Sequence, residues 1–225
     1  MLGLTGTTTP VALSPQTIIN CEPDGGSCNG GNPGAVYEFA HNYGIPHASC
    51  MQYTAHNLDE AHYCEPIDVC RECKPPPPKE SSTGLDNCWA VDHTKYYVGD
   101  YYEVKGADQM KAELATRGPI SCSIEATPIL EAYKPENYPS GIFSEKGTTP
   151  KHNHSISVVG YGVDHASGIP YWVVRNSWGT YWGDYGFYKV QMYKDNNWIE
   201  NWCLAGIPTL DKPSDSYDYL GVVRE

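Results

Sequence analysis

The sequence predicts an α+β fold with a helical, disulfide-rich first half and a β-rich second half. Helix-start signals and helical periodicity occur between residues 14 and 43. Short apolar and β-branched segments dominate from about residue 100 onward, which is the pattern of strands. Residues 45–99 hold five of the nine cysteines. We therefore expect a helical part over residues 1–99, a β-rich part over 100–208 and a loosely held polar tail over 209–225.

Length and charge narrow the classes of function. A chain of 225 residues with 40% apolar residues can bury a core, as one large domain or two smaller ones. The formal net charge is −12, which argues against a nucleic-acid partner. No apolar segment approaches the roughly 20 residues that a membrane-spanning helix needs. We therefore expect a globular protein that binds no nucleic acid and has no membrane span.

The cysteine content and the N-terminal segment point in different directions. Nine cysteines are typical of a protein from an oxidising compartment. Residues 1–15 have no basic region and no long apolar core, and they do not resemble a signal peptide. The odd cysteine count leaves at least one thiol without a partner in this chain. We expect a chain truncated at its N-terminus, because truncation would account for all three observations.

Two helices are predicted in the first half. Ser14 is a good N-cap residue, and Pro15 suits the first position of a helix. The second helix is predicted to begin after Asn32, with Pro33 in its first turn and Gly44 as its stop. The glycine-rich loop CEPDGGSCNGG connects the two helices.

Strands dominate the predicted second half. Strand-like segments occur between residues 90 and 104 and over 120–124, with a short helix over 108–117 between them. Residues 155–160 and 171–174 are apolar and rich in β-branched or aromatic side chains, and turn residues separate them. These last two segments are predicted to form a β-hairpin.

The predicted hairpin carries two polar side chains at its open end. His154 precedes the first strand and Asn176 follows the second, so the hairpin can bring them together. A side-chain amide bonded to an imidazole can hold it in one tautomer and one rotation, as a general base requires. The alternative is a histidine on the surface or in a satisfied core, which is the usual state of a histidine at the start of a strand.

Two segments of this hairpin resemble a known family. NHSISVVGYG and YWVVRNSWGTYWGDYGF are similar to the histidine and asparagine segments of the papain-like cysteine peptidases, and the similarity covers about residues 13–205. GDYYEV and GPISCSIEAT are most similar to the cathepsin X (cathepsin Z) branch of that family. The resemblance implies that His154 is the general base, that Asn176 orients it and that Trp178 shields the pair from water. It also implies a papain-like fold with a β-barrel-like second half.

The same resemblance identifies a piece that this sequence lacks. In the family, the nucleophilic cysteine lies in a Q-x-x-x-C-G-x-C-W type of segment, upstream of the segment that LSPQ resembles. The twelve residues before Leu13 contain neither cysteine nor glutamine. We therefore expect no catalytic helix, nucleophile or oxyanion-hole glutamine, and an inactive chain. Cys88 precedes a tryptophan but matches a disulfide cysteine of the family. The family pattern pairs Cys28 with the missing segment, so Cys28 is the expected unpaired thiol.

The glycine pair Gly30–Gly31 resembles the wall on which the family binds its substrate as an added β-strand. A plain tight turn is the alternative. The resemblance implies peptide or protein substrates, protein inhibitors as further partners, and no cofactor. A second hypothesis is a non-catalytic homologue that uses this wall to bind peptides or inhibitors. Complete family members are expected in lysosomes or outside the cell.

A metal site is the alternative to disulfides for part of the cysteine-rich region. Cys70 and Cys73 have the Cys-x2-Cys spacing of half a zinc site. A zinc site needs a second pair of ligands, and neither Cys64 nor Cys88 belongs to such a pair. We expect disulfides and no metal, with a connectivity that the spacing does not determine.

Overall fold

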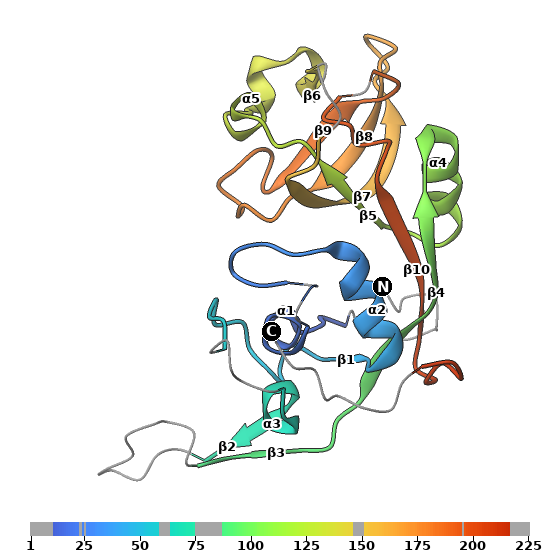
Figure 1. Cartoon of the computed structure of the whole chain (residues 1–225). Coiled ribbons are helices and arrows are strands. Elements are labelled where there is room, and N and C mark those ends of the chain that lie inside the picture. Colours follow the sequence, from blue (N-terminus) through green and yellow to red (C-terminus); the bar gives the residue numbers. More distant parts are fainter. Residues whose placement is uncertain are drawn as a thin grey trace. The chain divides into compact units, whose positions relative to one another are not determined.

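The computed structural model describes residues 11–22, 24, 26–58, 64–74, 87–145, 151–194 and 196–216. The chain forms two compact units (Figure 1). Unit 1 contains Met1–Asp100 and Ile207–Glu225, and unit 2 contains Tyr101–Gly206. The chain passes from one unit to the other within strand β4 (Lys95–Val104) and again within strand β10 (Cys203–Thr209).

Three short helices of unit 1 each begin with a proline: α1 (Pro15–Cys21), α2 (Pro33–Asn42) and α3 (Pro66–Val69). The Ser14 hydroxyl accepts a hydrogen bond from the Thr17 N–H at 3.2 Å, and the Asn32 side chain accepts one from the Gly34 N–H at 2.9 Å. Both predicted N-caps are therefore confirmed. Gly44 follows α2 with a φ of 72°, the left-handed conformation that ends a helix and favours glycine.

Short strands and disulfides complete unit 1. β1 (Ile45–Pro46) pairs antiparallel with β4, and β2 (Arg71–Cys73) pairs antiparallel with β3 (Cys88–Ala90). Three disulfides join Cys21 to Cys64, Cys50 to Cys70, and Cys73 to Cys88. The small core consists of Ile18, Cys21, Phe39, Ala40, Ile45, Cys64 and Val69.

Unit 2 is built around a sheet with the order β10-β5-β7-β8-β9-β6. Its further strands are β5 (Ile120–Ile124), β6 (Ile142–Phe143), β7 (His154–Val163), β8 (Pro170–Arg175) and β9 (Phe187–Gln191). All neighbours pair antiparallel except β6 and β9, which are parallel. The predicted strand over 120–124 and the predicted hairpin are thus confirmed, as β5 and as β7 with β8.

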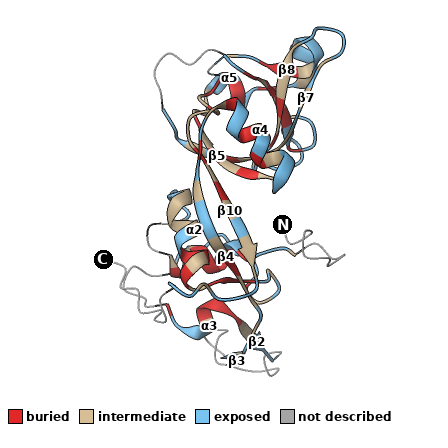
Figure 2. Ribbon diagram, turned by 90° about the vertical axis from the view of Figure 1, so that its right-hand side faces the viewer, coloured by how far each residue is buried: buried red, intermediate tan, exposed pale blue. Residues whose placement is uncertain are grey.

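Helix α4 (Gly106–Thr116) packs one face into unit 2. Its buried residues Ala107, Met110 and Glu113 are spaced by three and so share a face. Figure 2 shows that α4 has buried and exposed parts. Helix α5 (Pro128–Glu131) and two 3-10 helices, Pro135–Asn137 and Pro139–Gly141, follow β5. The largest fully buried side chains of the unit 2 core are Trp172, Tyr188, Phe143, Met110, Ile120, Ile124 and Leu130.

The α+β class is confirmed, whereas the expected barrel-like closure of the second half is not observed. Among the described strands, β6 has β9 as its one neighbour, so the sheet ends there instead of closing. Because β6 has only two residues, it leaves little backbone for a further partner. No helix among the described residues is long and apolar enough to cross a membrane.

The predicted tail over residues 209–225 is described only in part. β10 ends at Thr209, and residues 217–225 lie outside the described residues. In the described part, a carboxylate oxygen of Asp215 lies 3.2 Å from Nε2 of His41 on α2. The expected division of the chain into parts over residues 1–99, 100–208 and 209–225 remains a prediction.

Candidate active site

The hairpin of β7 and β8 brings His154 and Asn176 together. His154 is the first residue of β7, and Asn176 directly follows β8. The His154 Nε2 atom lies 2.8 Å from the Asn176 Oδ1 atom. Asn176 is buried, and its N–H donates to the Gly186 carbonyl at 2.9 Å, which holds the backbone of this residue in place. The predicted juxtaposition of the two side chains is therefore present.

A backbone donor determines how the Asn176 amide is oriented. The Ser177 N–H donates to Asn176 Oδ1 at 2.8 Å, and an N–H can only donate, so the amide oxygen must face this position. Since Oδ1 accepts, the hydrogen bond to His154 requires a proton on Nε2. In the neutral imidazole, the lone pair then lies on Nδ1, the atom that can accept a proton. The sequence offered no signal for this donor, because a backbone N–H has no residue identity.

Trp178 covers one face of the His154 imidazole. The two ring centroids are 4.8 Å apart and the ring planes are inclined by 25°, which is a stacked arrangement. Trp182 meets Trp178 edge-on at 5.0 Å, and its indole N–H donates to the Glu131 carbonyl at 2.9 Å. Trp182 is almost fully buried, so it gives Trp178 a rigid support. An indole in this position can restrict the access of water to the His–Asn hydrogen bond.

A glycine allows the loop after Asn176 to fold back on itself. Gly183 has a φ of 61°, and a Cβ atom at this position would overlap the carbonyl oxygen of Phe187. The nearby backbone bond from the Asp184 N–H to that same carbonyl measures 2.8 Å. Any other residue at position 183 would therefore displace the loop that carries Trp178 and Trp182.

The cysteines leave one thiol in the chain. Eight of the nine are paired, with Cys122–Cys203 as the fourth disulfide, and Cys28 is free and exposed. The expectation that Cys28 is the unpaired thiol is confirmed. Cys88 is bonded to Cys73, so it holds no thiol for a nucleophile. The preference for disulfides over a zinc site at Cys70 and Cys73 is likewise confirmed.

The predicted substrate wall lies in unit 1 and forms a tight turn. The Ser27 N–H donates to the Gly30 carbonyl at 2.7 Å, and the Gly30 N–H donates back at 3.2 Å. Gly30 has a φ of 126°, and no atom lies within 4 Å of the place where a Cβ would be. Both Gly30 and Gly31 are exposed. The turn alternative is thus present: the turn uses both backbone groups of Gly30, and Gly31 beside it is exposed.

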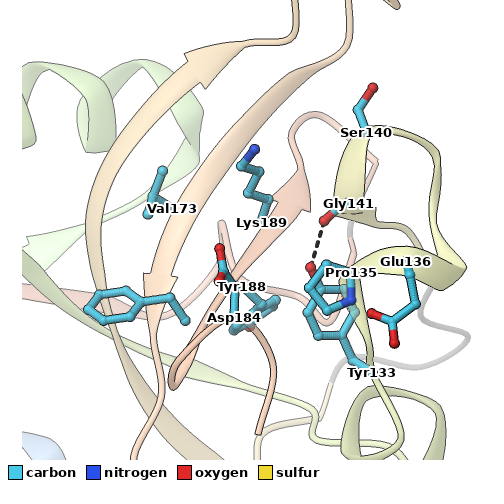
Figure 3. Close-up of a pocket in the computed structure, with 10 residues that line it drawn as sticks. Tyr133, Pro135, Glu136, Ser140, Gly141, Val173, Asp184, Tyr188 and Lys189 are labelled. Carbon is cyan, nitrogen blue, oxygen red and sulfur yellow. Dashed lines mark hydrogen bonds between the residues drawn. The ribbon is translucent and has the colours of Figure 1, made fainter. Parts of the chain in front are cut away.

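Unit 2 also contains a cavity of about 370 Å³ that is separate from the predicted site residues (Figure 3). Its lining combines aromatic side chains with Glu136, Asp184 and Lys189. Neither His154 nor Asn176 contributes to it.

Comparison with known proteins identifies the class to which this fold and site belong. Residues 4–207 match the family described as papain family cysteine protease. The chain therefore belongs to the papain family of cysteine proteases, as its His and Asn segments predicted.

The relatives of the chain include a protein of the predicted cathepsin Z branch and a cathepsin B-like protein. The chain is 40% identical over 182 residues to cathepsin Z of Onchocerca volvulus, which covers 80% of this chain and 53% of that protein. It is 31% identical over 216 residues to cathepsin B-like cysteine proteinase 6 of Caenorhabditis elegans, covering 89% of this chain and 54% of that protein. The chain thus spans about half the length of the curated relatives it matches.

Solved structures share the fold. Digestive procathepsin L 3 of Tenebrio molitor superposes with a TM-score of 0.66 at 26% identity, covering 91% of this chain and 58% of that chain. The bromelain protease of Ananas comosus, solved in complex with the E64 inhibitor, superposes with a TM-score of 0.64 at 23% identity. The latter match covers 89% of this chain and 80% of that chain and supports the fold alone.

Proposed function

We propose that this chain provides the base-bearing part of a cathepsin Z-like cysteine peptidase that acts on peptide or protein substrates. His154 is the general base, Asn176 is its positioning residue and Trp178 is its shield. The observation that carries the proposal is the 2.8 Å contact between His154 Nε2 and Asn176 Oδ1 beneath the stacked indole. A structural histidine on a strand would not need a buried amide and an aromatic cover together.

The proposed chemistry is proton transfer at His154 Nδ1. With Nε2–H donated to Asn176, Nδ1 takes the proton of a cysteine thiol, and the resulting thiolate attacks the carbonyl carbon of the substrate amide. The same Nδ1–H then protonates the leaving amine. Asn176 holds the imidazole in this tautomer throughout, and Trp178 keeps water from competing for the Nε2–H bond.

We further propose that the chain as it stands hydrolyses no peptide bond. Eight cysteines are held in disulfides, and the one free thiol, Cys28, lies in the glycine turn of unit 1. The sequence contains no segment of the Q-x-x-x-C-G-x-C-W type. A general base without a thiol to deprotonate leaves water as the attacking group, which is a much weaker nucleophile.

A hybrid protein tests this proposal directly. The upstream segment of cathepsin Z from Onchocerca volvulus, joined in frame before Leu13, supplies a nucleophile segment to this chain. We expect the hybrid to hydrolyse a fluorogenic peptide and the parent chain to release no fluorophore. In the hybrid, His154→Ala should lower kcat/KM by a factor of about 10² to 10⁴, because general acid–base catalysis contributes that much.

The exposed His152 offers a matched control for this experiment. It lies two residues away, with its ring 4.9 Å from that of Trp202. His152→Ala should leave the hybrid's activity within about twofold, as expected for an exposed surface position. An active hybrid that tolerates His154→Ala would refute the role of His154, and hydrolysis by the parent chain would refute its inactivity.

A second candidate function is peptide or inhibitor binding by the glycine wall. Gly31 is exposed, and among the described residues neither its N–H nor its carbonyl has a hydrogen-bond partner. Such a backbone can pair with an extended peptide as a strand does. Calorimetric titration with a capped peptide tests this candidate. Heat of binding in the parent chain that disappears in Gly31→Pro, which lacks the N–H, would favour a binding module. No heat of binding in the parent chain would count against a binding module.

The proposed compartment is a lysosome or the extracellular space. Four disulfides in a chain of this length are stable under oxidising conditions and are rare in reducing ones. Family membership supports the same assignment.

A further inference from the structure

A cluster of three metal-binding side chains lies in unit 1, apart from the proposed catalytic residues. Cys50 and Cys70 form a disulfide with an S–S distance of 2.09 Å. A ligand nitrogen of His93 and both sulfurs lie within 4.8 Å of one another. The cluster brings together the connection after β1, the end of α3 and the loop after β3, so that it depends on the tertiary fold.

The hydrogen bonding of His93 leaves one ring nitrogen without a partner. Nδ1 lies 3.1 Å from the Val91 carbonyl oxygen, and because a carbonyl can only accept, Nδ1 carries a proton. Nε2 is buried and has no hydrogen-bond partner among the described residues. A neutral imidazole bonded in this way places its lone pair on Nε2. This is the arrangement of a metal-binding histidine whose other nitrogen donates to a backbone carbonyl.

The backbone around the cluster is held by contacts other than the Cys50–Cys70 disulfide. The Arg71 N–H donates to the Cys50 carbonyl at 3.3 Å, and the Val91 N–H donates to the Cys70 carbonyl at 3.2 Å. In addition, Arg71 of β2 is paired with Ala90 of β3. Breaking the S–S bond therefore frees two sulfurs whose main chains remain anchored next to His93.

A cavity in unit 1 reaches one member of the cluster, His93. The cavity has a volume of about 540 Å³, and its lining includes Val69, which precedes Cys70, and Asp92, which precedes His93. Cys70 itself is buried, whereas Cys50 is half-buried. The cavity thus gives a hydrated cation access to His93, and a small reductant can reach the disulfide at the half-buried Cys50.

We propose that reduction of the Cys50–Cys70 disulfide converts this cluster into a Cys₂His site for Zn²⁺. A dithiol or phosphine reductant supplies two electrons, two protons are taken up, and the S–S bond becomes two thiols while the reductant is oxidised. Zn²⁺ then binds both sulfurs as thiolates and releases two protons. Two Cys ligands and one His ligand leave a fourth position for water. The site is a redox-gated metal centre and does not rest on the proposed peptidase function.

The dimensions suit this cation. Ligand distances of about 2.3 Å for Zn–S and about 2.0 Å for Zn–N place tetrahedral ligands roughly 3.5–3.8 Å apart. Once the S–S bond is broken the sulfurs must move apart, and the nitrogen must approach them from a position within 4.8 Å. Side-chain rotations about the anchored main chain can supply movements of this size.

Cobalt absorption provides the test, because Co²⁺ replaces Zn²⁺ and reports its ligands. The protein carries Cys28→Ser to remove the free thiol, is reduced with a phosphine, and is freed of reductant without air. We expect one tightly bound Co²⁺ per reduced chain, with the visible bands of tetrahedral Co²⁺ and near-ultraviolet thiolate-to-cobalt charge transfer. Zn²⁺ should abolish both signals, and the oxidised protein should show neither.

Two histidine variants separate this site from unspecific binding by the other reduced cysteines. His93→Gln should weaken Co²⁺ binding at least about tenfold. Loss of a residue that only hydrogen-bonds to a metal ligand already lowers metal affinity by about that factor, and loss of the ligand itself costs no less. His47→Gln is the matched control, because His47 is exposed, is close to Cys50 in sequence and contacts Ser49. It should leave the affinity unchanged. Equal affinities in wild type, His93→Gln and His47→Gln would overturn the proposal, as would absence of binding by the folded reduced protein.

A further variant keeps the test decisive if reduction unfolds the chain, which near-ultraviolet circular dichroism will reveal. Cys50→Asp frees the Cys70 thiol in the otherwise oxidised protein and adds a carboxylate ligand beside it. We expect Co²⁺ binding with one thiolate charge-transfer band, lost when His93→Gln is added. Binding that does not depend on His93, or no binding by this variant, would overturn the proposal in that case.

Discussion

Hydrogen-bond donors fix a proton position or a charge in two regions of unit 2. The Ser177 N–H orients the Asn176 amide and thereby selects the tautomer of His154. In the loop between β7 and β8, Asp164 Oδ2 accepts from the Ser167 hydroxyl at 2.6 Å and from the Ser140 hydroxyl at 2.8 Å. In the first region one donor fixes a proton position, and in the second region several donors stabilise one negative charge.

These donors lower the pKa of Asp164, and the Ser140 hydroxyl can be removed to test this. Hydrogen bonds from the Ser167 hydroxyl first, and then from Ser140, lower the pKa of Asp164 from 3.8 to about 2. The stabilisation is therefore present above pH 3.8 and is lost as the pH falls toward 2. We expect Ser140→Ala to raise the pKa of Asp164 toward 3.8 in a carboxyl-carbon NMR titration.

Ser144 provides the control for this titration. Its hydroxyl contacts Gln191 and Asn196 and not Asp164, so Ser144→Ala should leave the pKa of Asp164 unchanged. The explanation would be wrong if both variants titrated as the wild type does.

At the scale of elements, aromatic contacts hold the segment after α5 to the sheet. The Tyr133 ring lies 5.7 Å from that of Trp182 and 5.9 Å from those of Phe143 and Tyr188. Its hydroxyl donates to the Gly141 carbonyl at 2.6 Å (Figure 3), and burial raises its pKa to about 12. The α5 segment thus supports Trp182, which in turn supports Trp178 over the predicted general base.

The Cys122–Cys203 disulfide joins two elements that are already paired. The two residues are directly opposite each other in β5 and β10, and 81 positions separate them in sequence. A cross-link of this kind restricts the unfolded chain, so we expect the double variant Cys122→Ala/Cys203→Ala to lose about 2–4 kcal/mol in urea unfolding. Cys28→Ala, which breaks no disulfide, should change stability by no more than about 0.5 kcal/mol. Equal free energies of unfolding for Cys122→Ala/Cys203→Ala and Cys28→Ala would contradict this account.

At the scale of the whole molecule, each unit has its own hydrophobic core. The cluster around Phe39 lies entirely in unit 1, and the cluster around Phe143 lies entirely in unit 2. Because none of the described residues belongs to both clusters, we expect the two units to unfold in separate steps.

Two phenylalanine substitutions test the independence of the units. Phe39 and Phe143 are both fully buried, so replacing either by alanine should cost about 3–5 kcal/mol. In scanning calorimetry, Phe39→Ala should lower one transition and Phe143→Ala the other. A single transition that both variants shift equally would mean that the chain unfolds as one cooperative body.

Local features of this protein followed from its sequence alone. The caps at Ser14 and Asn32, the stop at Gly44 and the hairpin between β7 and β8 depend on residues close together in the chain. Such interactions leave a pattern in a short window, because backbone conformation and capping involve neighbours only. The papain-like His and Asn segments were recognisable for the same reason, since each is continuous.

The tertiary structure decided the features that join distant residues. The disulfide partners, the contact of Tyr133 with Trp182 and the meeting of His93 with Cys50 and Cys70 left no pattern of spacing in the sequence. Only the pairing of the strands shows that the sheet of unit 2 ends at the edge strand β6, which has one neighbour among the described strands. Packing of whole elements brings such residues together, and the free energy of that packing is spread over many side chains. Sequence therefore determined which chemistry this chain carries, and the fold determined which of its groups meet.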